Sequence, residues 1–459
     1  MIIKASKDDL NEILDIIKMG KELHMSLNLD QWNVNSPSDE EIINAIDKFY
    51  CLKEDGVIKG VMTLNVGVDK DYDDIDGSWI TNSTNYLTIH RLAVNKNYYH
   101  EGIGSKLMEY AINFAYRNHL DSVRIDTHND NSRMKGLIFK YGFKECGRIK
   151  INKNLPRIGF ELKLKRGLII TNAFSLTDST KKVLERYYEE FKNLNVVIDH
   201  KTNKEVLVYL DNDKLKANLD IYDFILYLDK DKHISKMLEK MGYHLFNNSD
   251  AIEISDDKML THIALSNNKI KMPKTISSPL YYGGTDDGEF IEKVINIIGF
   301  PMIVKEVFGS FGKQVHLVTN KDELVLVRDK LKYVPHIYQE FINTSYGTDI
   351  RVIVINKKVV ASMKRISSDD FRSNIELGAK GYPIILNDKI IKSAEKIATI
   401  LNLDYCGLDF LIGQNDEPIL CEVNSNAMFN EIEKVTKINV CKLYCEHIYK
   451  TIYGGENND

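Results

Sequence analysis

The spacing at which apolar residues recur differs between successive segments of this chain: some segments are strand-like and others have helical spacing. Residues 1–4 are strand-like, and after them Leu10, Ile13 and Ile17 recur at helical spacing. Two apolar runs then flank a short turn at Glu54-Asp55-Gly56, a pattern typical of a β-hairpin. The blocks therefore predict a domain that mixes strands and helices.

The next 80 residues continue in the same way. A polar and acidic stretch at 69–85 predicts a long loop. We expect strands at 87–94, 123–127, 143–146 and 158–164, and helices at 105–118 and 132–140. A strand, a glycine turn, a helix and a second strand form one α/β unit. The first domain is predicted to span residues 1–165.

A second α/β start follows and leads into a third region. Strands are expected at 168–171, 196–199 and 224–228, with a helix at 181–194, so a small α/β domain is predicted for residues 167–256. From 257 to 455, helices are expected to alternate with mostly strand-like runs at 301–306, 316–319, 337–341, 350–355, 359–364, 408–412 and 418–423. The fold class is therefore α/β multidomain.

Composition narrows the function classes. A chain of 459 residues with a net charge of -5 and interspersed charges indicates a folded protein of more than one domain, with no nucleic-acid partner. No window approaches the roughly 18 apolar residues of a membrane span, so we expect no membrane partner and a cytoplasmic protein. The six cysteines match no metal-ligand or CxxC spacing and are predicted to be free thiols, with Cys441 and Cys445 buried on a C-terminal helix.

A glycine turn in the first domain suggests a phosphate site. Gly102-Ile103-Gly104-Ser105 stands at a helix start, directly after the strand that ends at Val94 and a short loop. Backbone N–H groups at such a turn, with the helix dipole behind them, can bind a pyrophosphate. An ordinary tight turn would give the same pattern.

Nearly all of residues 1–164 resembles the GNAT acetyltransferase family. The likeness lies in the strand Ile89–Val94, the glycine turn and its helix, the strand Ser122–His128, and Asn131 with Tyr141-Gly142-Phe143. It implies a site for acetyl-CoA. Leu92, Ala93 and Val94 would bind its pantetheine, Gly102, Ile103, Gly104 and Ser105 its pyrophosphate, and Asn131 its distal arm.

Two departures from that family bear on catalysis. Tyr99 stands where Arg or Gln is usual, and Ile138 stands where a tyrosine general acid is often found. Acetyl transfer would then need another proton donor or water. Gln31, Trp32 and His90 are candidate acceptor-site residues, and a packing indole and a core histidine are equally consistent with the sequence.

The third region carries two further sets of polar residues. An apolar strand ends in Lys305 and precedes the loop Gly309-Ser310-Phe311-Gly312, which would suit a triphosphate or a simple surface hairpin. Asp409 and Glu422 lie in apolar strands, with Asn424 two residues beyond Glu422. Carboxylate and amide oxygens are Mg²⁺ ligands, and buried acids need a cation or a strong partner. A salt bridge or a strand-end cap is the alternative.

Residues 257–450 resemble the RimK-like ATP-grasp ligases, which include glutamate ligases and glutathione-synthetase-type enzymes. Motifs that match in order include Gln339-Glu340-Phe341-Ile342, Asp349-Ile350-Arg351, Met363-Lys364-Arg365, Phe371-Arg372-Ser373-Asn374, Gly407-Leu408-Asp409 and Glu422-Val423-Asn424-Ser425. Residues 167–256 resemble the small domain that precedes the ATP-grasp fold in these enzymes.

This second resemblance implies a cofactor set and a role for each residue. ATP and two Mg²⁺ ions are expected. Lys258, Lys305 and the loop with Ser310 would contact phosphates, Glu340 and Phe341 adenine, Asp349 the ribose, and Arg372, Ser373 and Asn374 would close on the nucleotide. Asp409, Glu422 and Asn424 would bind the metals, while Arg351 and Arg365 would steady the carboxylate and its acyl phosphate as catalytic residues. Gln314 and Glu376 depart from the pattern, and Glu376 suggests a different acyl or amine substrate.

The leading hypothesis is therefore an ATP-dependent carboxylate–amine ligase that joins amino acids or small peptides, with an acetyl-CoA-dependent N-acetyltransferase domain. The alternative makes the first domain a non-catalytic acetyl-CoA or substrate-binding module and the ligase a modifier of a peptide precursor. The sequence leaves the substrates and the oligomeric state open, a homo-oligomer included.

Overall fold

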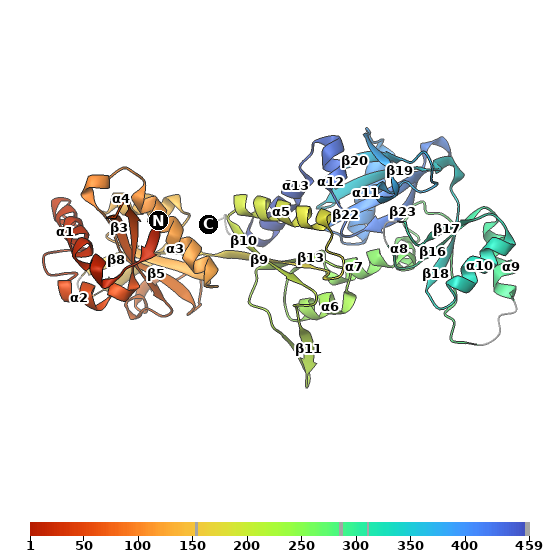
Figure 1. Ribbon diagram of the computed structural model, residues 1–459. Coiled ribbons are helices and arrows are strands. Elements are labelled where there is room, and N and C mark those ends of the chain that lie inside the picture. Colours follow the sequence, from red (N-terminus) through yellow and green to blue (C-terminus); the bar gives the residue numbers. More distant parts are fainter. Residues whose placement is uncertain (152–154, 284–287, 310–311, 455–459) are drawn as a thin grey trace. The chain divides into compact units, whose positions relative to one another are not determined.

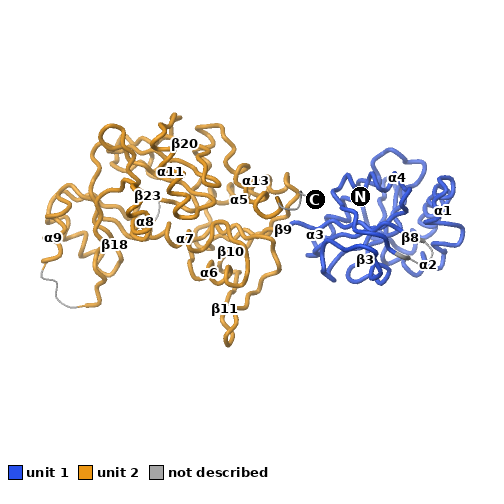
Figure 2. Tube along the Cα trace, turned by 180° about the vertical axis from the view of Figure 1, so that it is seen from behind, with its two compact units in different colours: residues 1–165 blue, residues 166–459 orange. Residues whose placement is uncertain are grey.

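The computed structural model describes residues 1–151, 155–283, 288–309 and 312–454. The chain divides into two compact units, residues 1–165 and residues 166–459 (Figure 2). Within the described ranges, no helix is both long and apolar enough to cross a membrane.

The first unit is built on one mixed sheet with the strand order β1-β2-β3-β5-β6-β8-β7-β4. Its strands are β1 (Ile2–Lys4), β2 (Phe49–Glu54), β3 (Val57–Val66), β4 (Ile75–Gly77), β5 (Tyr86–Val94), β6 (Ser122–Thr127), β7 (Lys144–Ile151) and β8 (Leu155–Lys163). Strand β5 runs parallel to β6, but this pairing ends at Ile89, so the last residues of β5 pair with β3 alone. Space therefore opens beside the end of β5.

Helices cover this sheet and form its cores. They are α1 (Leu10–Ser26), α2 (Asp39–Asn44), α3 (Ile103–Arg117) and α4 (Ser132–Lys140). Leu107, Met108 and Ala111 of α3 are fully buried in a cluster with residues of β3, β5, β6 and β8. The expectation of a long loop at 69–85 is wrong in part, because β4 lies within it and pairs with β7 as a three-residue edge strand.

The second unit begins with a sheet in the order β10-β9-β13-β14. Its elements are β9 (Lys165–Thr171), α5 (Asp178–Asn193), β10 (Val196–Thr202), β13 (Phe224–Leu228), α6 (Lys232–Lys240), β14 (Leu245–Phe246) and α7 (Ser249–Asp256). Strand β13 is a fully apolar run of five residues that pairs in parallel with β9 and β14, as expected of a buried strand. A hairpin of β11 (Val208–Asp211) and β12 (Lys214–Ala217) forms a separate pair.

Two further sheets, of four and five strands, complete the second unit (Figure 1). The first has the order β15-β18-β16-β17 and contains β15 (Thr275–Ser277), β16 (Met302–Glu306), β17 (Val315–Val318) and β18 (His336–Glu340), with helices α8 (Lys258–Leu265), α9 (Glu289–Ile298) and α10 (Lys321–Lys330). The second has the order β21-β20-β19-β22-β23 and contains β19 (Thr348–Ile355), β20 (Lys358–Ile366), β21 (Lys380–Pro383), β22 (Tyr405–Ile412) and β23 (Pro418–Asn424). Helix α11 (Asp388–Ile400) lies between β21 and β22 in the chain, and α12 (Asn430–Thr436) and α13 (Val440–Tyr453) follow β23.

The C-terminal helix joins the parts of the second unit. Cys441 and Cys445 of α13 are fully buried, as expected, in a core cluster that also holds residues of α5 and β13. All six cysteines are free. The α/β multidomain fold class is thus confirmed.

Candidate active site

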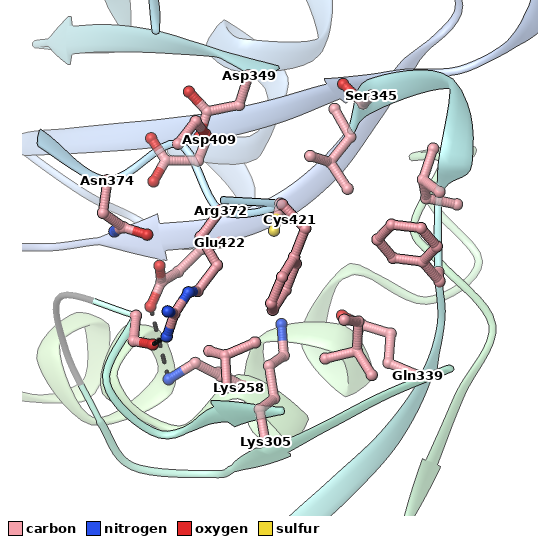
Figure 3. A pocket seen from close by; sticks show the side chains of 18 of the residues that line it. Lys258, Lys305, Gln339, Ser345, Asp349, Arg372, Asn374, Asp409, Cys421 and Glu422 are labelled. Atoms are coloured by element: carbon pink, nitrogen blue, oxygen red, sulfur yellow. Dashed lines mark hydrogen bonds and ion pairs between the residues drawn. The ribbon is translucent and has the colours of Figure 1, made fainter. Parts of the chain in front are cut away.

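One cavity in the second unit is lined from both the four-stranded sheet that contains β16 and the five-stranded sheet (Figure 3). Strands β16 and β18 supply one side, and β19, β20, β22 and β23 the other. The cavity collects most of the residues predicted to bind nucleotide or metal or to act in catalysis: Lys258, Lys305, Glu340, Phe341, Asp349, Arg365, Arg372, Ser373, Asn374, Asp409 and Glu422.

Two buried lysines place positive charge in this cavity. Lys305 is 4% exposed on β16, and Lys258 is the first residue of α8, whose N-cap Asp257 accepts from two backbone N–H groups of the first turn. The ammonium of Lys258 donates to the carbonyls of Val307 and Gly309 and lies 3.5 Å from Glu422. Burial lowers the pKa of Lys258. Two ammonium groups in a cavity out of bulk water suit the phosphates of a nucleotide.

The register of the second sheet brings two arginines onto the predicted acids. Asp349 lies opposite Arg365, and Arg351 lies opposite Asp409. Arg351 donates two hydrogen bonds of 2.7 Å to Asp409, and Arg365 bridges Asp349 and, at 3.0 Å, Asp409. Burial would raise the pKa of Asp409, but the two guanidiniums outweigh it and lower that pKa to about 2. This four-charge cluster keeps Asp409 ionised.

The three predicted metal ligands lie on neighbouring strands. Asp409 is the register partner of Glu422, and Asn424 follows on the same face of β23. The expectation that both acids are buried is wrong for Glu422, whose side chain is 25% exposed, because it lies at the cavity wall. Asn424 is absent from the residues that line the cavity, and its buried amide nitrogen has no partner in the described structure.

The fit to Mg²⁺ rests on oxygen chemistry. Across the described residues, no three His, Cys, Asp or Glu side chains gather as a metal site. Two carboxylates facing each other across β22 and β23 still offer hard oxygen ligands, which Mg²⁺ usually completes with phosphate oxygens and water. Arg351 and Arg365 also form ion pairs with Asp409, so the alternative interpretation of this acid, a salt bridge in place of a metal ligand, fits the structure as well. The metal assignment therefore stays a prediction.

Close packing holds the end of the glycine loop against the opposite wall. Arg372 donates a 2.6 Å hydrogen bond to the carbonyl of Gly312, and a Cβ at Gly312 would lie 2.6 Å from the side-chain oxygen of Asn374. The φ of Gly312 is +70°, in the left-handed region that favours glycine. Ser310, predicted to contact phosphate, lies outside the described residues.

Gly312→Ala is therefore expected to raise the KM for ATP by about 10-fold, since strain and the clash with Asn374 both displace the loop. Gly242→Ala is the matched control, because Gly242 also has a left-handed φ, of +96°, but a Cβ there meets nothing within 4 Å. Steady-state kinetics of ATP hydrolysis measures both. An equal effect of the two variants would mean that the contact with Asn374 is irrelevant.

A second cavity of this unit adjoins the first through Arg365, which lines both. It is lined by residues of α5, β20 and α12, and Arg351 lies here rather than in the first cavity. Its wall carries both signs of charge, including Lys182, Arg186 and Glu376. The arginine–aspartate cluster thus borders both cavities.

The first unit has its own cavity beside the end of β5. It is lined by every residue predicted to contact acetyl-CoA: Leu92, Ala93, Val94, Gly102, Ile103, Gly104, Ser105 and Asn131. Gly102 adopts a φ of +74° as the N-cap of α3, so the first N–H groups of that helix begin at the cavity. Tyr99 also lines it, whereas Ile138 is fully buried in the core.

The candidate acceptor residues Gln31, Trp32 and His90 line a neighbouring cavity. Trp32 also packs against Gly20, where a Cβ would lie 2.5 Å from the indole. His90 lies 2.7 Å from Asp69. The packing role and the cavity-lining role thus coexist for Trp32.

Comparison with known proteins gives these cavities a family. A model described as the RimK-like ATP-grasp domain matches residues 255–448, and one described as the acetyltransferase (GNAT) family matches residues 18–143. An uncharacterized protein of Mycoplasma pneumoniae, named as an MG012 homolog, is 34% identical over 277 residues, which are 58% of this chain and 93% of that protein. The chain belongs to the RimK-like ATP-grasp family. Its N-terminal unit is a GNAT domain.

One further relative and one solved structure are similar to this ATP-grasp protein. Human N-acetylaspartylglutamate synthase A is 32% identical over 214 residues, 46% of this chain and 54% of that protein, so the chain spans about half the length of this relative. The structure of a D-alanine–D-alanine ligase from Bacillus anthracis complexed with ATP has a TM-score of 0.48 at 17% identity, covering 62% of this chain and 98% of that one.

Sequence reasoning missed several residues of the ATP-grasp cavity. Ile303 stands two residues before Lys305, and Leu411 two residues after Asp409, so both share a strand face with a predicted ligand. The period of two along a strand could have indicated them. Ser345 and Thr348 come from the chain between β18 and the start of β19, and no sequence pattern indicated them.

A buried histidine beside the cavity predicts acid sensitivity. Burial and Lys305 lower the pKa of His262 in α8 to about 4. Between pH 6.5 and 4 the unfolded chain then binds a proton that the folded chain does not, so stability falls as the pH falls through this window. His262→Gln is expected to shrink the loss of unfolding free energy between pH 7 and pH 5 by about 2 kcal/mol.

Urea unfolding followed by circular dichroism at both pH values measures this change. His233→Gln on the surface of α6 is the control, because His233 is exposed. An unchanged pH dependence in His262→Gln would refute the assignment.

Proposed function

We propose that the ATP-grasp unit is an ATP-dependent, ADP-forming carboxylate–amine ligase that joins amino acids or small peptides through an acyl phosphate, and that the GNAT domain is an acetyl-CoA-dependent N-acetyltransferase. The observation that carries the ligase proposal is the shared wall of two cavities. Lys258, Lys305, Asp409 and Glu422 line the nucleotide side, and Arg365 faces both sides.

The chemistry divides into two displacements. A carboxylate oxygen of the first substrate attacks the γ-phosphorus of ATP, the bond to the β–γ bridging oxygen breaks, and ADP leaves. The amine nitrogen of the second substrate then attacks the acyl carbon, the bond to the phosphate oxygen breaks, and phosphate leaves with one proton lost from nitrogen. Both steps develop negative charge on phosphate oxygens, which preorganised cations stabilise.

The chain's own residues would supply those cations. Lys258 and Lys305 would neutralise the departing phosphates, because both ammonium groups are held in the cavity. Arg365, 2% exposed and fixed by Asp349 and Asp409, would hold the transferring group between the two cavities. Asp409, Glu422 and Asn424 would hold two Mg²⁺ ions, which supply further positive charge to the triphosphate when bound.

The name of one relative supports the substrate class. Human N-acetylaspartylglutamate synthase A carries in its name a product with an N-acetyl group and an amide between two amino acids. A fused GNAT domain would supply such an acetyl group: the amine nitrogen attacks the thioester carbonyl carbon, the C–S bond breaks, and the CoA thiolate takes up a proton. An N-acylated dipeptide is therefore our candidate product.

The ligase proposal is tested by incubating the full chain with ATP, Mg²⁺ and a panel of amino acids and N-acetylamino acids. We expect ADP and phosphate to form only with a productive pair, and hydroxylamine to trap a hydroxamate of the activated acid. Formation of AMP and pyrophosphate would overturn the acyl-phosphate route.

A non-catalytic GNAT domain is the second candidate, and one observation favours it. Ile138, fully buried, occupies the position at which the sequence comparison expects a tyrosine acid, so no side-chain proton donor stands there. Under this reading, acetyl-CoA binds in calorimetry without release of free CoA in the presence of any amine of the panel. Acetyl transfer to one of those amines would exclude it.

A further inference from the structure

The second cavity of the GNAT domain has a volume of about 270 Å³, which suits a small molecule. His24, Trp32, Leu92, Asn131 and Met134 line both this cavity and the acetyl-CoA cavity. A molecule bound here would therefore lie beside the acetyl group.

Unsatisfied polar atoms concentrate around this small cavity. Among the described residues, His24 Nδ1, Asn65 Oδ1 and Arg157 Nε are buried without a hydrogen-bond partner, and all three residues line it. Buried polar groups in folded proteins are nearly always paired, so three orphans around one space indicate that a polar ligand or water completes them. The cavity is thus built for a polar occupant.

Arg91 is the cation in this wall without a partner. Its side chain is half-buried and lines the cavity, and within the described residues it makes no ion pair or hydrogen bond. Glu41, Asp69 and Asp71 act on its charge, but none lies within ion-pair distance. Its φ of +51° is rare for a residue with a side chain and accompanies the register shift between β3 and β5. Strain that aims a free guanidinium into a cavity is typical of a binding site.

The other arginine of the wall and two of its acids, Asp69 and Asp126, are already engaged. Arg157 donates to Asp126 at 3.1 Å, and Asp126 also accepts from the Tyr72 hydroxyl at 2.8 Å. Asp69 lies 2.7 Å from Nε2 of His90, and the other nitrogen of this ring lies 3.7 Å from Asp126. One side of the cavity is thus a carboxylate–histidine pair, and Arg91 is an unpaired cation.

We propose that this cavity binds an amine that carries a carboxylate, a free amino acid or a short peptide, with Arg91 pairing with the carboxylate and the Asp69–His90 pair facing the ammonium. A guanidinium binds a carboxylate through two parallel hydrogen bonds, and an ammonium is attracted to the carboxylate of Asp69. The identification of this molecule as the acetyl acceptor rests on the proposed acetyltransferase function. It makes the acceptor a possible substrate of the ligase as well.

The test uses the full chain and compares each amino acid with the amine that lacks its α-carboxylate. Release of CoA from acetyl-CoA is measured for the wild type, Arg91→Gln, Arg91→Lys and the control Arg117→Gln, an exposed arginine at the end of α3. We expect Arg91→Gln to raise the KM for the amino acid by about 10- to 100-fold, because a hydrogen-bonded charge pair is lost. The KM of Arg91→Lys should lie between those of the wild type and Arg91→Gln, and the KM of the control should match that of the wild type. The affinity for acetyl-CoA, measured by calorimetry, should not change in any variant.

Amines without a carboxylate should react poorly with the wild type and be insensitive to Arg91→Gln. An unchanged KM in Arg91→Gln, or equal rates with and without the carboxylate, would overturn the proposal. Direct calorimetric titration of amino acids, without nucleotide or acetyl-CoA, separates the two claims. If acetyl-CoA does not bind, the proposed acetyl transfer is wrong. The amino-acid site is still supported if Arg91→Gln, unlike the control Arg117→Gln, weakens the affinity for amino acids. If Arg91→Gln leaves that affinity unchanged, the proposed site is wrong.

Discussion

Glu422→Gln is expected to lower the kcat of the ligase by about 10²- to 10³-fold while leaving the fold intact. Glu422 lies opposite Asp409 in the register of β22 and β23, and its ion pair with Lys258 spans 3.5 Å. The substitution keeps the shape but removes a negative oxygen from the proposed metal site, and loss of one preorganised electrostatic partner commonly costs this much. Initial rates of ADP formation at varied Mg²⁺ measure the effect.

The same hairpin offers a matched control. Glu417→Gln, before β23, removes a carboxylate whose side chain is 45% exposed and 3.3 Å from Lys271. We expect it to retain wild-type rates, since exposed pairs contribute little. If Glu422→Gln kept both its kcat and its Mg²⁺ dependence, the metal assignment of this residue would be wrong.

Arg365→Met is expected to destabilise the ATP-grasp unit by about 3–5 kcal/mol, since it leaves two buried carboxylates short of a cation. Asp349 loses its guanidinium, and Asp409 keeps only Arg351. Both tryptophans of the chain, Trp32 and Trp79, lie in the GNAT domain. Tryptophan fluorescence therefore follows the unfolding of the GNAT domain, whereas circular dichroism follows both units. In urea, Arg365→Met should lower the midpoint of the transition seen by circular dichroism and leave the fluorescence transition unchanged.

Two further variants make this result specific. Asp349→Asn combined with Arg365→Gln removes one charge of each sign and is expected to recover part of the loss. Lys358→Met breaks an exposed pair with Glu395, its side chain being 74% exposed, and should change stability by less than about 1 kcal/mol. If Arg365→Met lowered the free energy of unfolding by no more than Lys358→Met does, the charges of Arg365, Asp349 and Asp409 would not be tightly coupled.

The sequence predicted most of the strands and the glycine turn before α3, and the reason is local. The seven strand-like runs expected between 301 and 423 correspond to β16, β17, β18, β19, β20, β22 and β23. They could be predicted because a buried strand consists of a short run of mostly apolar residues. The short edge strands β4, β15 and β21 escaped prediction, since edge strands of three or four residues carry little apolar content.

The site was harder to predict than the fold. Family motifs indicated Asp349, Arg365 and Asp409 as separate binding groups, but their ionic cluster depends on the register between β19, β20 and β22, which local sequence does not encode. Arg91 was not singled out at all. An arginine within an apolar strand motif gives no sign of its left-handed backbone, and only the structure shows its guanidinium without a partner.

Transfer of oxygen-18 tests the central claim most directly. The full chain is incubated with ATP, Mg²⁺, an amine and acids labelled with oxygen-18 in the carboxylate, drawn from the productive pair of the panel. If the carboxylate attacks the γ-phosphorus, one labelled oxygen leaves with each phosphate released, and mass spectrometry of the phosphate detects it. Stoichiometric amide formation with unlabelled phosphate would contradict the acyl phosphate and the role given to this cavity.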